Sequence, residues 1–120
     1  MNAVRVARVY DPPSPGDGAR VLVDRLWPRG LSKAAAALDE WDRAVAPSRE
    51  LRAWYAHDPA RFDEFAERYR AELEQPEPAA ALAALRERCS RGPVTLLTAT
   101  RALEISQAAV LAGVLSEPDA

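Results

Sequence analysis

The sequence predicts a single α/β domain in which helices cover a small parallel β-sheet of about three strands. Residues 20–24 (RVLVD) and 94–99 (VTLLTA) are short, mainly apolar runs bounded by structure-breaking or polar residues. Runs of this kind are typical of parallel strands that are buried on both faces. Helical patterns separate the two runs along the chain, and this alternation is expected when crossover helices join parallel strands.

A third strand and a long loop precede the first buried run. Residues 4–9 (VRVARV) alternate apolar and cationic side chains, which predicts a strand with one exposed face. Residues 11–18 (DPPSPGDG) contain three prolines and two glycines. Neither a helix nor a β-ladder can pass through such a segment, so we expect a loop there.

Serine side chains mark the starts of two helices. Ser32 precedes a short alanine-rich segment, and Ser48 precedes a segment that carries Leu51 on its inner face. A serine hydroxyl in this position accepts an unpaired amide hydrogen of the first helical turn. The residues between these helices, 38–47, are ambiguous: their apolar spacing fits a helical face, but the segment is short and Pro47 ends it.

Three further helices are expected in the second half of the chain. Asp58 and Pro59 form a start signal for the first of them, and Gly92 lies near the end of the second. Ile105 begins the apolar stripe of the last one, so we expect it to pack into the core or to line an apolar wall. The three stripes are Phe62, Phe65, Ala66, Tyr69 and Leu73; Leu82, Leu85 and Cys89; and Ile105, Ala108, Ala109, Leu111, Ala112 and Leu115.

Charge and length exclude several classes of function. The 120 residues carry a net charge of −2, so the chain lacks the overall positive field that drives binding to nucleic acid or anionic membranes. The first ten residues are too charged for a signal peptide, and no apolar run is long enough to span a membrane. We therefore expect a cytoplasmic protein.

The chain offers few residues for metal or redox chemistry. Cys89 is the only cysteine and His57 the only histidine, which excludes an intramolecular disulfide and a zinc site built from several thiolates. Cys89 lies on an apolar helix face and is expected to be inert. His57 either reaches a cleft or forms a local hydrogen bond at a helix start. We expect no metal and no cofactor, since no dinucleotide- or phosphate-binding glycine motif is present either.

The strand ends provide the best candidates for a site, because ligands of open parallel sheets bind beyond the carboxyl ends of the strands. DRLWPRG follows the first buried strand. Arg25 and Arg29 can form forked hydrogen bonds to a phosphate or carboxylate, Trp27 can stack, and Asp24 can orient an arginine or act as an acid or base. Alternatively, these residues satisfy one another and the core, with no ligand involved.

The end of the second buried strand adds Thr98, Thr100 and Arg101. Their hydroxyls and guanidinium lie close to the start of the last helix, where the helix dipole favours an anion. We therefore expect these three residues to share one ligand-binding cleft with Asp24, Arg25 and Arg29.

Four segments resemble a known family. They are RVYDPPSPGDG, RVLVDRLWPRGLSK, the long stretch from WDRAVAPSRELR to FAERYRAEL, and GPVTLLTATR. Together they are similar to the short, YeaO-like group of the domain of unknown function 488 family, over nearly the whole chain. The resemblance implies three parallel strands whose carboxyl ends share a cleft, and it implies no particular reaction, because the family has no established activity.

One loop departs from the pattern of that group. The resemblance implies an aspartate and a histidine in the last loop, where this chain has Ala102 and Ile105. If the two missing groups perform acid–base or metal chemistry in relatives, this chain either has lost that chemistry or uses only the binding half of the site.

Three functions remain open on the sequence alone. The first is binding of a small anionic ligand, such as a nucleotide or a phosphorylated metabolite. The second is a hydrolase or transferase that uses Asp24 as acid or base and the arginines to stabilise negative charge. The third is a protein–protein interaction module.

Overall fold

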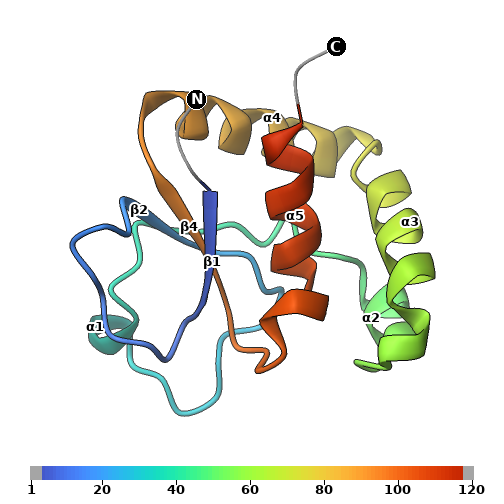
Figure 1. Ribbon diagram of the computed structural model, residues 1–120, viewed down its shortest axis with the longest axis horizontal. Helices are drawn as coiled ribbons and strands as arrows, with labels where there is room; N and C mark the ends of the chain where they lie inside the picture. The colour runs from blue at the N-terminus through green and yellow to red at the C-terminus, as the bar shows by residue number, and fades with distance from the viewer. Residues whose placement is uncertain (1–3, 118–120) are drawn as a thin grey trace.

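The computed structural model describes residues 4–117 and contains a parallel sheet of four strands (Figure 1). The strands are β1 (Val4–Arg8), β2 (Ala19–Leu22), β3 (Glu40–Trp41) and β4 (Val94–Thr98), in the spatial order β1-β4-β2-β3. Every neighbouring pair is parallel. The predicted α/β class and parallel pairing are confirmed. The sheet has four strands where about three were expected, because a two-residue edge strand carries no readable periodicity.

The helices follow the predicted caps and stripes. Ser32 and Ser48 accept hydrogen bonds from the amides of Ala35 and Leu51, and so begin the first two helices. The helices are α1 (Lys33–Ala36), α2 (Arg49–Tyr55), α3 (Phe62–Glu72), α4 (Pro76–Arg91) and α5 (Gln107–Ser116), with single 3₁₀ turns η1 (Pro59–Arg61) and η2 (Leu103–Ile105). Across residues 4–117, none of them combines the length and apolar character needed to cross a membrane.

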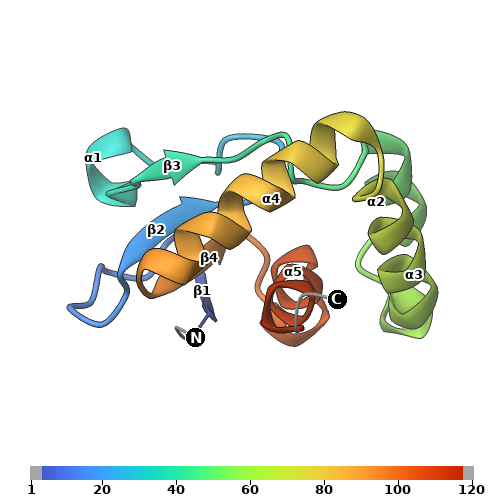
Figure 2. The ribbon, with the colours of Figure 1, turned by 90° about the horizontal axis from the view of Figure 1, so that it is seen from above.

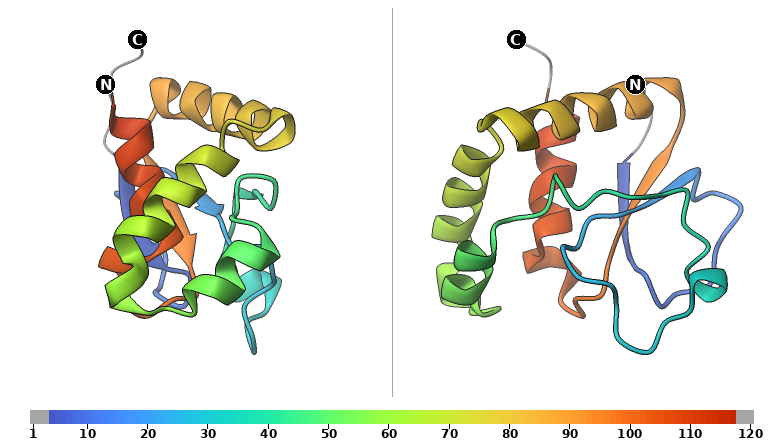
Figure 3. Two further views of the ribbon diagram at one scale, coloured as in Figure 1. Left: turned by 90° about the vertical axis from the view of Figure 1, so that its right-hand side faces the viewer. Right: turned by 180° about the vertical axis from the view of Figure 1, so that it is seen from behind.

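The two faces of the sheet are covered differently. Val21 and Leu96 belong to the larger core cluster, which contains side chains from α2 to α5. Leu22 and Leu97 belong to a smaller cluster on the other face, where α1 and the segment 24–41 supply the cover. Figures 2 and 3 show α2 and α3 at the far end of the molecule from α1. This alternation along β2 and β4 explains why both strands read as continuous apolar runs.

Ile105 does not pack into the core, one of the two positions that its stripe predicted. It lies in η2, is only half-buried and belongs to neither core cluster of the described residues. Ser106 begins α5 by accepting a hydrogen bond from the amide of Ala109. The buried stripe therefore starts one turn later, at Ala108, because the cap separates η2 from the helix.

A buried ion pair fastens the proline-rich loop to the sheet. The Asp17 carboxylate accepts hydrogen bonds from the guanidinium of Arg20 at 2.7 Å, from Arg5 at 2.8 Å and from the amide of Ser14 at 2.9 Å. Hydrogen bonding and the neighbouring guanidinium groups hold the pKa of Asp17 below its usual range. Arg20 also donates to the carbonyl oxygens at the end of α1, so one buried arginine ties the loop to that helix.

Asp42 is a second buried carboxyl, and it has far fewer hydrogen-bond and ion-pair partners than Asp17. Within the described residues, the only hydrogen bond to its carboxyl group comes from the amide of Val45, at 3.3 Å. Burial, together with the nearby negative charge of Glu40, raises the pKa of Asp42 to about 6. The folded protein therefore holds this proton more tightly than the unfolded chain, and the ionised form destabilises the fold.

We expect Asp17→Ala to lower the free energy of unfolding by about 2 to 4 kcal/mol, because it leaves the buried Arg20 guanidinium without its counter-ion. Glu64→Ala removes an exposed ion pair with Arg68 on α3 and should cost less than about 1 kcal/mol. Urea unfolding of both variants at neutral pH measures the difference. Equal decreases in the free energy of unfolding for the two variants would contradict the stabilising role assigned to Asp17.

Asp42→Asn should stabilise the protein at neutral pH by about 1 to 3 kcal/mol, because it removes a charge whose ionisation the fold opposes. The gain should be absent below about pH 3, where the carboxyl is protonated in both states, and should develop as the pH rises to about 6. Urea unfolding across this range measures it. Exposed Asp11→Asn serves as the control, and a gain independent of pH would refute the assignment.

Candidate functional site

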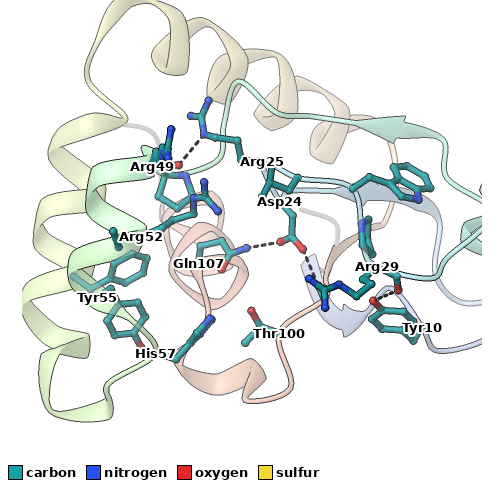
Figure 4. A pocket seen from close by; sticks show the side chains of 17 residues that line it. Tyr10, Asp24, Arg25, Arg29, Arg49, Arg52, Tyr55, His57, Thr100 and Gln107 are labelled. Atoms are coloured by element: carbon teal, nitrogen blue, oxygen red, sulfur yellow. Dashed lines mark hydrogen bonds between the residues drawn. The ribbon is translucent and has the colours of Figure 1, made fainter.

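The candidate site is a cavity of about 580 Å³ beyond the carboxyl ends of β2 and β4 (Figure 4). Arg49 and Arg52 of α2 form one wall, and Arg29 lies on the opposite wall. Asp24 and Gln107, from the end of β2 and the start of α5, lie between these walls. The cavity therefore occupies the position where ligands of open parallel sheets bind.

Positive charge dominates this cavity. Four arginines line it, and Asp24 is the only carboxylate among the lining residues. Arg25 donates to the carbonyl oxygens of Pro47 and Ala46, at 3.2 and 3.3 Å, which leaves its charge without a counter-ion. Within the described chain, the side chains of Arg29, Arg49 and Arg52 form neither a hydrogen bond nor an ion pair.

The guanidinium of Arg52 has no hydrogen-bond partner in the described chain. Its Nε atom is buried and has no acceptor among the described residues. A buried N–H group without a partner loses hydration and gains nothing in return. The Nη atoms of Arg52 form no hydrogen bond in the described chain and are not among its buried unpaired atoms, so these are the donors that a ligand in the cavity can reach.

Asp24 accepts three hydrogen bonds that join separate elements. The hydroxyl of Thr98 donates to Oδ1 at 2.7 Å, and the amide of Ala99 donates to Oδ2 at 2.8 Å. The side-chain amide of Gln107 also donates to Oδ1. Burial raises the pKa of Asp24, while these three donors and the charge of Arg52 oppose the rise.

Two aromatic residues on the wall of the cavity are also held by hydrogen bonds. Trp27 donates from Nε1 to the carbonyl oxygen of Leu31 and packs edge-on against Trp41, with ring centroids 5.2 Å apart. Tyr10 donates its hydroxyl to the carbonyl oxygen of Arg29 at 2.8 Å. These contacts fix the backbone of the loop that follows β2. They therefore fix where the Arg29 side chain starts, although that side chain itself has no hydrogen-bond partner in the described chain.

Most of the residues that the sequence singled out lie together at this cavity. Asp24, Arg25, Trp27, Arg29 and Thr100 line it. Their roles toward a ligand remain predictions.

Thr98 and Arg101 lie elsewhere. Thr98 is fully buried and contacts Asp24 through its hydroxyl. Arg101 is exposed and is not among the residues that line this cavity. Its role toward a ligand also stays a prediction.

Three important lining residues, Arg49, Arg52 and Gln107, were missed from the sequence. Their elements do not end a strand, so the rule that ligands bind at strand ends could not select them. A usable signal exists in the cap at Ser48, since residues one and four positions after it lie on the same helical face. Gln107 has no comparable signal, because its role depends on Asp24, which is 83 residues away in sequence.

His57 lines the cavity in a left-handed backbone conformation, with φ at 56°. The local cap at the next turn comes from Asp58, whose side chain accepts from the amide of Ala60. Among residues 4–117, no group of three or more histidine, cysteine, aspartate or glutamate side chains could hold a metal ion.

Asp24→Ala should lower the free energy of unfolding by about 2 to 4 kcal/mol, because the buried hydroxyl of Thr98 and the amides of Ala99 and Gln107 lose their acceptor. Exposed Glu67→Ala on α3 should change it by less than about 0.5 kcal/mol. Chemical denaturation at pH 7 measures both. An Asp24→Ala variant as stable as the parent protein would show that the carboxylate does not hold these elements together.

The comparisons with known proteins agree on one family. The family model described as "Inactive DUF488-N3 subclade" matches residues 3–119. The chain is 55% identical to the uncharacterized protein Rv3073c of Mycobacterium tuberculosis over 113 residues, covering 94% of this chain and 93% of that protein. It is 42% identical to the uncharacterized protein YeaO of Escherichia coli over 109 residues, covering 91% and 93%.

No solved structure matches the chain. The family assignment therefore rests on sequence, over nearly the full length of the chain and of its relatives. On these matches, the chain belongs to the DUF488 family.

Proposed function

We propose that this protein binds a small anionic ligand, a nucleotide or a phosphorylated metabolite, in the cavity beyond the carboxyl ends of β2 and β4. The observation that carries the proposal is the convergence of four arginines, none with an ion-pair partner in the described chain, on one cavity. Like charges that share a cavity repel one another, and an anion converts this repulsion into attraction.

The chemistry of the lining suits a phosphate group. A guanidinium presents its N–H donors in a planar fork that matches the oxygen atoms of a phosphate or carboxylate. Arg29, Arg49 and Arg52 have these donors available. The cavity volume of about 580 Å³ falls within the range of roughly 300 to 1,000 Å³ typical of small-molecule sites.

The surroundings of Asp24 favour binding over catalysis. A hydrolase or transferase that used Asp24 as acid or base would need a free carboxylate lone pair directed at its substrate. Three hydrogen bonds from the protein already occupy three of the roughly four lone-pair sites of the Asp24 carboxylate. The absence of the aspartate and histidine at Ala102 and Ile105, and the word "inactive" in the description of the matching subclade, support the same preference.

Arg52→Gln should weaken the binding of inorganic pyrophosphate by about 10-fold or more, because it removes a charged donor from inside the cavity. Arg101→Gln is the matched control, since it removes the same charge from the neighbouring exposed loop, and it should change the affinity less than about twofold. Isothermal titration calorimetry at low salt measures the dissociation constants.

Two results would overturn the proposal. One is the absence of saturable binding to the parent protein. The other is an equal loss in the Arg52 and Arg101 variants, which would indicate general attraction to surface charge rather than a site.

A further inference from the structure

We infer that the ligand is a phosphate monoester whose organic part carries an N–H or O–H group, and that Gln107 accepts a hydrogen bond from this group through Oε1. This inference rests on the proposed function and names the chemistry of the part of the ligand that the arginines do not bind. Asp24 acts here as a positioning residue, because it sets the orientation of Gln107.

The orientation of the Gln107 side chain follows from its partners. Its Nε2 atom donates to Oδ1 of Asp24 (Figure 4). The same atom donates to Oγ1 of Thr98 at 3.2 Å. Asp24 acts as an acceptor at both oxygens, since Thr98 and the amide of Ala99 also donate to it. An amide that rotated by half a turn would place its own oxygen against this acceptor, so the nitrogen must face Asp24.

The amide oxygen of Gln107 is consequently directed away from Asp24. No described residue donates a hydrogen bond to it, and it is not among the buried side-chain atoms that lack a partner, which in the described chain are Nε of Arg8 and of Arg52. Oε1 is therefore accessible, and Gln107 lines the cavity. The cavity thus presents one fixed acceptor among groups that are otherwise mainly donors.

The arginine donors and the Gln107 acceptor line different parts of the cavity, and each part suits a different group of the ligand. Arg49 and Arg52 project from α2 on one wall, while Gln107 reaches the cavity from α5. A phosphate group on the arginines accepts hydrogen bonds from their accessible Nη atoms and offsets the positive charge. A hydroxyl or amino group on the rest of the same molecule satisfies Gln107, so the two elements together select a substituted phosphate over an unsubstituted one.

Affinities for three phosphate monoesters test this selection. Phenyl phosphate has no donor in its organic part, ribose 5-phosphate has hydroxyl groups, and AMP has both hydroxyl and amino groups. We expect the parent protein to bind ribose 5-phosphate or AMP at least five times more tightly than phenyl phosphate in isothermal titration calorimetry. A gain for ribose 5-phosphate would assign the recognised donor to a sugar, and a gain for AMP alone would assign it to a base.

Gln107→Met preserves the size of the side chain and should reduce that ratio of affinities to within twofold of one. Gln75→Met, the matched control, replaces the exposed glutamine that precedes α4 and should leave the ratio at its parent value. Asp24→Asn tests the positioning role. The backbone amide of Ala99 donates to this side chain, so the oxygen of the new asparagine must face Ala99 and its nitrogen must face Gln107. The Gln107 amide then rotates by half a turn to accept from that nitrogen. Its Oε1 atom no longer faces the cavity. This variant should therefore lose the same preference.

The outcomes separate the two proposals. If the parent protein binds none of the three phosphates, the proposed function fails. If it binds phenyl phosphate as tightly as the other two, only the present inference fails. A ratio that stays at fivefold or more in Gln107→Met, or in Asp24→Asn should the first variant not fold, would also overturn the inference.

Discussion

The arrangement of this site depends on one buried carboxylate. Asp24 stands just beyond β2 and accepts hydrogen bonds from Thr98 and Ala99 at the end of β4 and from Gln107 at the start of α5. These contacts join the ends of two adjacent parallel strands to the helix that follows them. A charged acceptor is suited to this task, since hydrogen bonds to an ionised group are stronger than those between neutral groups. The carboxylate thereby fixes the base of the cavity.

Around this base, the protein keeps more positive charge than it neutralises. Elsewhere, arginines such as Arg20, Arg68 and Arg88 have acidic partners, whereas the four arginines of the cavity have none in the described chain. Arg25 is held by backbone carbonyl oxygens, which fix its position without cancelling its charge. This contrast separates arginines that stabilise the fold from arginines that are available to a ligand.

Local patterns in the sequence were sufficient for the fold class and for most elements. The apolar runs of β2 and β4 and the serine caps of α1 and α2 are confirmed, because each depends on residues within a few positions of one another. The edge strand at Glu40 and Trp41 was not predicted from these local patterns. Its pairing with β2 is a long-range contact, and two residues have no period of their own. Ile105 was misplaced for a related reason, since a cap at Ser106 interrupted a stripe that looked continuous.

The residues of the candidate site can likewise be separated into those that local sequence predicts and those that only packing brings together. The sequence by itself determined that an acid, two arginines and a tryptophan follow a buried strand, and that the last loop lacks the aspartate and histidine that the family resemblance implied. Only the tertiary structure decided that Arg49 and Arg52 face these residues, that Arg101 does not, and that Asp24 is already occupied by donors. The physical reason is that these contacts form where β2, β4, α2 and α5 converge. Residues on these elements are far apart in sequence, so their distances and hydrogen bonds are set by tertiary packing and not by the residues next to them in the chain.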